Sequence, residues 1–298
     1  MPHEHDISHH HSHHAVSAKT VKMLLLSFAI NMLLSLVEII GGIIAGSVAL
    51  IGDALHNTCD ALSLLIAVIS FKIGNRKASA KYTFGFRRAE TIGGLVNLVL
   101  LFISGCYLLV EGCEHLIFPQ PIAGKIIIWI SVLALIIDAV TAKISHHDSH
   151  HNYNMKMVFI HNLADALGSV GVIISGLCIV WFGIFRIDGV IAILIAFYMI
   201  YQSVVSFPAI VNILMNAAPE YISIDEIKRE IMQIADVRDV HHIHLWCINE
   251  DDISIECHVV SCNMEVIRPI RELLRQKFAV THCNIQVENS DKCFECEL

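Results

Sequence analysis

The sequence is poor in charge and lacks several patterns that mark soluble classes of protein. Only 16% of its 298 residues are charged, against about 25% in ordinary soluble domains. It has no basic patch with interleaved aromatic residues, so we expect no nucleic-acid partner. It has no glycine-rich loop ending in lysine, so we expect no nucleotide partner. Its 10 cysteines do not follow an extracellular disulfide framework, and we expect reduced thiols.

Long apolar runs dominate the chain instead. Hydrophobic residues make up 55% of it and the mean hydropathy is +0.63, which predicts an α-helical, multi-pass integral membrane protein surrounded by lipid. A spanning helix needs about 20 apolar residues. Six segments are long enough, and we predict a transmembrane helix in each: Val21–Ala45, Ser47–Ile73, Ala89–Ile117, Ile122–Ile144, Asn154–Phe182 and Asp188–Ile213.

The distribution of Lys and Arg predicts the orientation of these helices. Most of them, including Arg76, Arg88 and Lys143, fall on one side of the membrane, and only Lys125 and Arg186 fall on the other. The positive-inside rule then places both termini in the cytoplasm. The N-terminal residues lack the three regions of a cleaved signal peptide, so we expect none. The short loops and compact tails favour a bacterial inner (plasma) membrane over a vesicle.

One pattern occurs twice inside the apolar segments. His56 and Asp60 are four residues apart, and His161 and Asp165 repeat the spacing, so each pair occupies one helix face. A charged side chain at mid-bilayer costs roughly 2.5–3.5 kcal/mol, and a single pair of this kind is more often a local hydrogen bond than a metal site. Two copies supply two imidazole nitrogens and two carboxylates, a set suited to tetrahedral Zn²⁺. We therefore predict an intramembrane metal site shared by two helices.

Two further histidine-rich segments lie outside the predicted spans. Residues 1–18 form a His-dense tail too polar to fold alone, which either gathers metal or is an accidental, tag-like tract. The loop over residues 145–152 contains four more: His146, His147, His150 and His151. Solvated imidazoles bind divalent metals weakly, and we favour a metal-gathering role for this loop over a random polar one.

The apolar continuity ends near Met215, which divides the chain into three parts. We expect a disordered cytoplasmic tail over residues 1–18, a transmembrane domain over 19–214, and a cytoplasmic metal-binding dimerisation domain over 215–298. Within the last part the periodicity predicts the order α-β-β-α-β, a small two-layer α+β domain with a mostly antiparallel sheet. The predicted elements are Ile224–Ile234, Val240–Ile248, Ile253–Val260, Val266–Phe278 and Asn284–Glu288.

This last part is rich in metal-binding side chains. Strand alternation places His242 and His244 on one face and His241 on the other. Cys293 and Cys296 have the spacing of a zinc half-site. We predict a second metal site here. The alternatives for the cysteine pair are a redox dithiol and an unstructured tail.

The chain resembles the zinc branch of the cation diffusion facilitator family along nearly its whole length. The resemblance is carried by Glu38–Gly42, Gly46-Ser47, Asp53–His56, Asp60, Tyr82–Gly85, Arg88–Glu90, His161, Asp165 and Val240–Trp246. It implies a homodimeric, six-span exporter that exchanges cytoplasmic Zn²⁺ for protons, with a ferredoxin-like cytoplasmic domain. Cd²⁺ and Co²⁺ are further candidate cargoes, and no organic cofactor is implied.

The resemblance also implies ligand sets. The transport site maps onto His56, Asp60, His161 and Asp165, and His at the first position goes with zinc selectivity in the family. In the cytoplasmic domain, ligands map onto His241 and His258, with Cys293 and Cys296 similar to those of animal vesicular transporters. The family histidine before the last strand aligns with Thr281, and we take the adjacent His282 as its replacement.

The chemistry of the predicted site indicates a mechanism. Zinc requires neutral imidazole, so protons and metal compete for the same nitrogens, which permits antiport by linked binding. The first alternative to a transporter is a membrane zinc sensor without flux. The second is an intramembrane metalloprotease, which would need a His-Glu-x-x-His helix. That motif is missing from the sequence, so we expect no enzyme.

Overall fold

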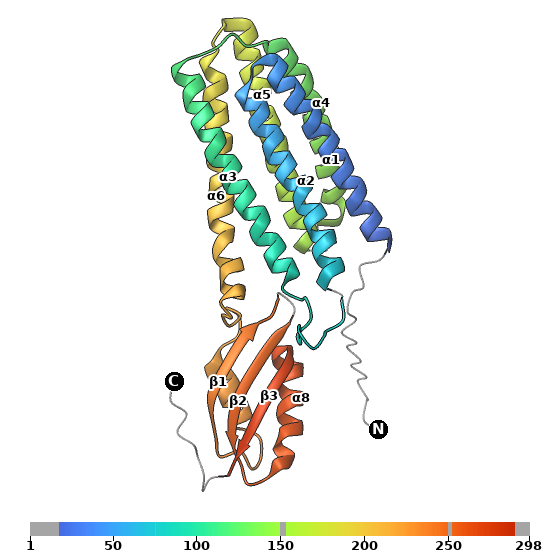
Figure 1. Ribbon diagram of the computed structural model, residues 1–298, viewed down its shortest axis with the longest axis vertical. Helices are drawn as coiled ribbons and strands as arrows, with labels where there is room; N and C mark the ends of the chain where they lie inside the picture. Colours follow the sequence, from blue (N-terminus) through green and yellow to red (C-terminus); the bar gives the residue numbers. More distant parts are fainter. Residues whose placement is uncertain (1–17, 75, 150–152, 250–251, 290–298) are drawn as a thin grey trace. The chain divides into compact units, whose positions relative to one another are not determined.

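The computed structural model describes residues 18–74, 76–149, 153–249 and 252–289, with side chains for all of these except 18–24, 27 and 141–162. Long helices come first and a small mixed domain follows (Figure 1). The long helices are α1 (Ala18–Ala45), α2 (Val48–Gly74), α3 (Ala89–Ile117), α4 (Gly124–Ser149), α5 (Tyr153–Phe182) and α6 (Arg186–Leu214). A helical region followed by a small domain containing a sheet is what the sequence predicted.

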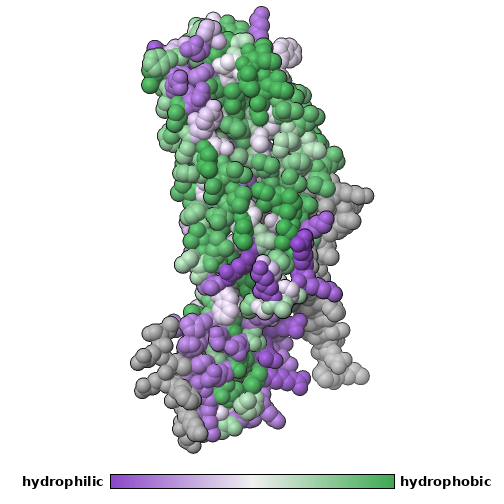
Figure 2. Space-filling view, in the orientation of Figure 1, coloured by the Kyte–Doolittle hydropathy of each residue, from purple (hydrophilic) through white to green (hydrophobic). Residues whose placement is uncertain are grey.

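Within the part of the chain that the structure describes, five of these helices are long and apolar enough to cross a membrane. The apolar windows lie in α1, α2, α3, α5 and α6, with mean hydropathies of 1.5 to 2.1. The outward-facing side chains agree: Leu33, Val110 and Trp181 are 63%, 69% and 70% exposed. Figure 2 shows the helices covered with hydrophobic surface over most of the visible face. Apolar side chains exposed over this length are typical of helices in lipid.

The chain divides into two compact units. The first comprises residues 1–68 and 104–198, and the second residues 69–103 and 199–298. The first therefore contains α1, most of α2, the second half of α3, α4, α5 and the first half of α6. The second contains the remaining halves of α3 and α6 and the C-terminal domain.

The start of α2 is fixed by a buried carboxylate of α6. The Ser47 hydroxyl donates to Asp188 Oδ1 (2.5 Å), and the backbone N–H groups of Val48 and Ala49 donate to Asp188 Oδ2 (2.7 and 3.1 Å). The first amides of a helix have no partner within the helix, and Asp188 supplies one here. This clamp anchors the helix that carries His56 and Asp60.

Helices α4 and α5 pack closely because glycines face each other. A Cβ atom on Gly176 would lie 2.8 Å from Ile128 Cγ1 and 3.1 Å from the carbonyl oxygen of Gly124. Only residues without a side chain permit this approach, which is the usual way that membrane helices come together. The pairing holds α5, the helix of Asp165, against α4.

The C-terminal domain contains α7 (Ile224–Ile231), β1 (Asp239–Cys247), β2 (Ile253–Val260), the 3-10 turn η1 (Met264–Val266), α8 (Ile267–Phe278) and β3 (Val280–Glu288). The strand order is β1-β2-β3. β1 and β2 are antiparallel, but β2 and β3 are parallel. The prediction of a mostly antiparallel sheet is therefore wrong for the second pair. Its connection runs through α8, and a helical crossover returns the chain to the starting end of the sheet.

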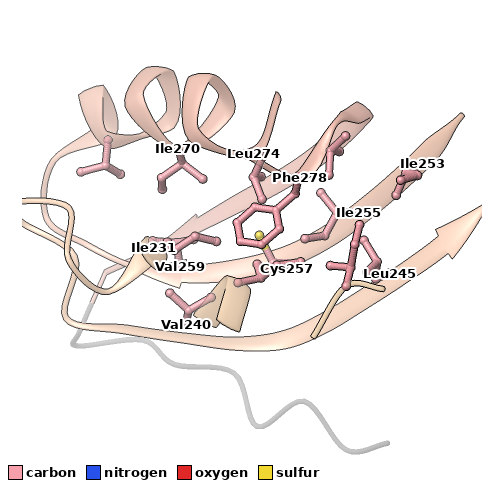
Figure 3. Close-up of a cluster of buried hydrophobic side chains, with 14 residues drawn as sticks. Ile231, Val240, Leu245, Ile253, Ile255, Cys257, Val259, Ile270, Leu274 and Phe278 are labelled. Atoms are coloured by element: carbon pink, nitrogen blue, oxygen red, sulfur yellow. The ribbon is translucent and has the colours of Figure 1, made fainter. Parts of the chain in front are cut away.

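One face of this sheet forms the core of the domain with the helices. Ile255 and Cys257 of β2 pack with Ile231 of α7 and with Ile270 and Leu274 of α8 (Figure 3). Because side chains alternate along a strand, the opposite face carries His258 and Glu256 of β2. The polar side chains considered below lie on that face.

Candidate metal centres

Among the residues whose side chains are described, two groups of His, Asp and Glu bring their ligand atoms within 4.8 Å of one another. The first lies in the helical region and contains His56, Asp60 and Asp165. The second lies on the sheet and contains His241, His258 and Glu288.

In the first group, a single imidazole nitrogen faces carboxylates from two helices. His56 Nε2 lies 3.3 Å from Asp60 Oδ2, one turn further along α2, and 3.2 Å from Asp165 Oδ1 of α5. Ligands bound about 2.0–2.1 Å from a tetrahedral Zn²⁺ are about 3.3–3.4 Å apart. His56 is only 4% exposed. The three side chains are thus spaced and sheltered as zinc ligands would be.

The fourth residue of the predicted set is His161. It belongs to α5, one turn before Asp165, and its side chain is outside the described part of the chain. Helical geometry puts it on the same face of α5 as Asp165.

A cavity of about 310 Å³ opens beside this group. It is lined by Asp53, His56 and Asp165 and otherwise mainly by apolar residues of α5 and α6. Tyr198 of α6 also lines it, with its ring edge-to-face on His56 at 5.4 Å between centroids. The sequence analysis did not single out Tyr198, because one tyrosine in an apolar helix carries no periodic signal.

Further carboxylates are buried next to the group. The Ser169 hydroxyl of α5 lies 3.3 Å from Asp53 Oδ2 and 3.1 Å from Asp138 Oδ2 of α4. Asn57 Nδ2 donates to Glu38 Oε2 of α1 (3.1 Å). Buried carboxylates in an apolar bundle are costly unless they have polar partners. Here α1, α2, α4 and α5 all contribute polar side chains to one interior region.

The second group lies across the three strands of the sheet. His258 Nδ1 is 3.0 Å from Glu288 Oε1, and His241 Nε2 is 3.4 Å from Glu288 Oε2. His241 pairs with His258 in the β1–β2 register. Sequence reasoning missed Glu288. The available signal was that Asn284, Gln286 and Glu288 follow one another at every second position of β3, which places them on one face of the strand.

A β-bulge changes which histidines share a face. His241 pairs with His258 and His244 with Glu256, and the register shifts between them. His258 and Glu256 are two residues apart and point to the same side, so His241 and His244 also share that side. The prediction that His241 lies opposite His244 is wrong, because the bulge inserts an extra residue into β1.

The other predicted ligands of this domain are not all brought to the group. His282 pairs with Ser254, whereas Gln286 pairs with His258, so His282 lies four residues along the sheet, about 13 Å away. Cys293 and Cys296 lie outside the described residues, as do His150 and His151. His146 and His147 belong to the end of α4, and their side chains are not described.

Cys257 belongs to the core and not to this group. Its side chain is fully buried on the helix-facing side of β2. Burial raises the pKa of its thiol to about 12, which disfavours the thiolate that binds metal.

Comparison with known proteins decides the family. Residues 24–215 match the cation efflux transmembrane domain, and residues 219–290 match the cation efflux protein cytoplasmic domain. The chain belongs to the cation diffusion facilitator family. This is a family of membrane transporters and not of enzymes.

Characterised members of the family resemble it along most of their length. The zinc transporter ZitB of Escherichia coli (strain K12) is 31% identical over 296 residues, covering 95% of this chain and 93% of ZitB. The cadmium, cobalt and zinc/H⁺-K⁺ antiporter of Bacillus subtilis is 30% identical over 300 residues, 96% of each chain. The metal cation efflux system protein CzcD of Cupriavidus metallidurans is 30% identical over 285 residues, 94% of this chain and 89% of CzcD.

Proposed function

We propose that the chain exports Zn²⁺ from the cytoplasm in exchange for protons, through a site formed by His56, Asp60, His161 and Asp165. The observation that carries this proposal is His56 Nε2, held 3.2–3.3 Å from carboxylates of α2 and α5 inside apolar helices. The cavity beside it leaves space for a cation next to these ligands. The names of the relatives, a zinc transporter and a cadmium, cobalt and zinc/H⁺-K⁺ antiporter, support the cargo, the coupling, and Cd²⁺ and Co²⁺ as further substrates.

The coupling follows from competition at the ligands. A neutral imidazole and ionised carboxylates bind Zn²⁺, whereas the protonated imidazole cannot. A site open to the cytoplasm at near-neutral pH loads zinc. When the same site opens to a more acidic compartment, protons displace the metal. No nucleotide is needed for this cycle.

The arrangement in the membrane is part of the proposal. α4 crosses together with the five apolar helices, which gives six spans within residues 19–214, both termini in the cytoplasm and a bacterial inner membrane as the location. Residues 215–298 form a ferredoxin-like cytoplasmic domain through which two chains form a homodimer. The histidines of the tail over 1–18 and of the loop over 145–152 gather metal near the entrance.

In the cytoplasmic domain we propose a separate zinc site at His241, His258 and Glu288. Cys293 and Cys296, a few residues beyond the end of β3, are the candidates for completing it. Both cysteines follow Glu288 closely in the sequence, and we propose that their thiolates reach the group. A metal site on this domain is also what the alternative function, a membrane zinc sensor without flux, would require.

A growth assay separates the two functions. The chain is produced in a bacterium that lacks its own zinc exporters, and growth is measured against external zinc. We expect the wild type to restore zinc tolerance and Asp165→Asn to lower transport about 10–100-fold or more, since a ligand is lost. Asp225→Asn, at an exposed position of α7, is the matched control and should behave as wild type. Normal tolerance with Asp165→Asn would reject the site, and no tolerance with any variant would favour the sensor.

A further inference from the structure

A single hydroxyl lies between two buried carboxyl groups inside the helical region. Ser169 Oγ of α5 is 3.3 Å from Asp53 Oδ2 of α2 and 3.1 Å from Asp138 Oδ2 of α4, and all three side chains are buried. A hydroxyl has one hydrogen to donate, and an ionised carboxylate can only accept. Ser169 can therefore donate to one of the two carboxyls, and the hydrogen in the other contact must come from a carboxyl group.

The charges around this pair also favour a bound proton. Asp53 and Asp138 interact electrostatically with each other and with Glu38 of α1. Asp165 of α5 adds a further negative charge near Asp53, and His56 of α2 is the group of opposite sign. Carboxyl groups that share an apolar site do not all ionise, and one of them keeps its proton. Because a charged His56 attracts an ionised Asp53, we assign the proton to Asp138.

The hydroxyl connects this proton to the metal cavity. Asp53 lines the cavity together with His56 and Tyr198, and Ser169 bridges Asp53 to Asp138. When the O–H bond of Asp138 breaks, Ser169 accepts that proton and passes its own to Asp53, which releases it to water in the cavity. The bonding electrons stay on the Asp138 carboxylate, and the hydroxyl is restored.

We propose that Asp138 and Asp53 hold one exchangeable proton, which leaves when Zn²⁺ binds beside His56 and returns when the metal departs. The inference rests on the proposed exchange of zinc for protons and adds a second proton site to the imidazoles. The loss of this proton places a negative charge near the bound cation. Zinc binding and ionisation of the pair therefore favour each other.

The test counts protons released when zinc binds to the full-length protein in detergent. Titration calorimetry at near-neutral pH, in two buffers with different ionisation enthalpies, gives the number. Asp138→Asn keeps the shape of a neutral acid and should release about one proton fewer per chain while binding as much zinc as the wild type. Protons from the cytoplasmic domain, the tail and the His-rich loop are the same in every variant and cancel in the difference.

The neighbouring buried carboxyl provides the matched control. Glu38 Oε2 accepts a hydrogen bond from Asn57 Nδ2, and an amide does not pass a proton on, so Glu38→Gln should release as many protons as the wild type. An unchanged proton number in Asp138→Asn would overturn the proposal. So would a loss of bound zinc in that variant, because Asp138 would then serve the metal directly. An equal loss of protons in Glu38→Gln would also overturn it, because the proton would not belong to this pair.

Infrared difference spectra of the wild type provide a measurement that does not depend on how a variant folds. Zinc should reduce the carbonyl stretch of a protonated carboxylic acid, and Asp138→Asn should lack this change. A wild-type spectrum without the change would reject the proton site.

The proposed function fails in different ways from the proton site. Zinc binding that Asp165→Asn leaves intact would reject the transmembrane metal site. A chain that binds zinc and releases this proton without any flux would reject export and keep the proton site.

Discussion

At the scale of single residues, the proposed transport site depends on which atoms His56 presents to a metal. Its Nε2 faces Asp60 and Asp165, one carboxylate from its own helix and one from α5. A nitrogen among oxygen ligands favours zinc over harder cations, because imidazole suits Zn²⁺ whereas carboxylate and water suit Mn²⁺ and Mg²⁺. Under the proposed function, a histidine at this position therefore favours Zn²⁺ as the transported ion.

Replacing this nitrogen with oxygen should change selectivity more than activity. For His56→Asp we expect transport of Mn²⁺ relative to Zn²⁺ to rise about tenfold, a difference of about 1.4 kcal/mol between the two ions. Competition between the two metals for uptake into vesicles measures this ratio. Tyr198→Phe keeps the ring against His56 and should leave the ratio unchanged. An unaltered ratio in His56→Asp would show that His56 is not a ligand.

The sequence could predict the residues at this site only as far as helical periodicity reaches. A separation of four positions was enough to pair His56 with Asp60, because an α-helix fixes that geometry locally. The structure brings Asp165 to them from α5. Tyr198 and Ser169 lie near through packing between helices, which no spacing within one segment encodes.

At the scale of elements, the packing of α4 on α5 determines where Asp165 lies. The contact between Gly124 and Gly176 has no room for a methyl group. Gly171, on the same helix, differs, because a Cβ atom there would meet Ile191 Cγ2 at 3.7 Å, an ordinary contact distance.

These two glycines give a matched pair of substitutions. Gly176→Ala should separate α4 from α5 and destabilise the protein by about 1–3 kcal/mol, the usual cost of overpacking. Gly171→Ala should have little effect, since its methyl group fits. Thermal unfolding of the two purified variants in detergent measures the difference. Equal melting temperatures would mean that the close approach of α4 and α5 does not stabilise the bundle.

The C-terminal domain shows where strand prediction succeeds and where it fails. The alternation of apolar residues gave the bounds of β2, Ile253–Val260, as the structure has them. It missed the first residues of β3, because Val280 and Cys283 do not alternate clearly with their neighbours. The bulge in β1 and the parallel pairing of β3 depend on contacts between strands. A pattern read along one strand cannot contain them.

At the scale of the whole molecule, a chain of the cation diffusion facilitator family contains a buried group of His56, Asp60 and Asp165 in its helices. The length and apolar character of the helices follow from the sequence alone, since hydrophobic runs of this length have few other structures. Burial of charged residues in such helices indicates a cation path. The direction of transport and its coupling to protons can be observed only while the protein works in a membrane that separates two compartments.

Zinc uptake into proteoliposomes that contain only the purified chain tests whether the protein exchanges Zn²⁺ for protons. An imposed pH gradient, acidic on the side that receives zinc, should drive uptake, and collapsing the gradient should stop it, because protons release the metal from the imidazoles. Asp60→Ala should abolish the gradient-driven uptake while the protein still inserts and elutes as the wild type does. Zinc that binds to the wild type but never crosses, with or without the gradient, would contradict proton-coupled export and identify the chain as a sensor.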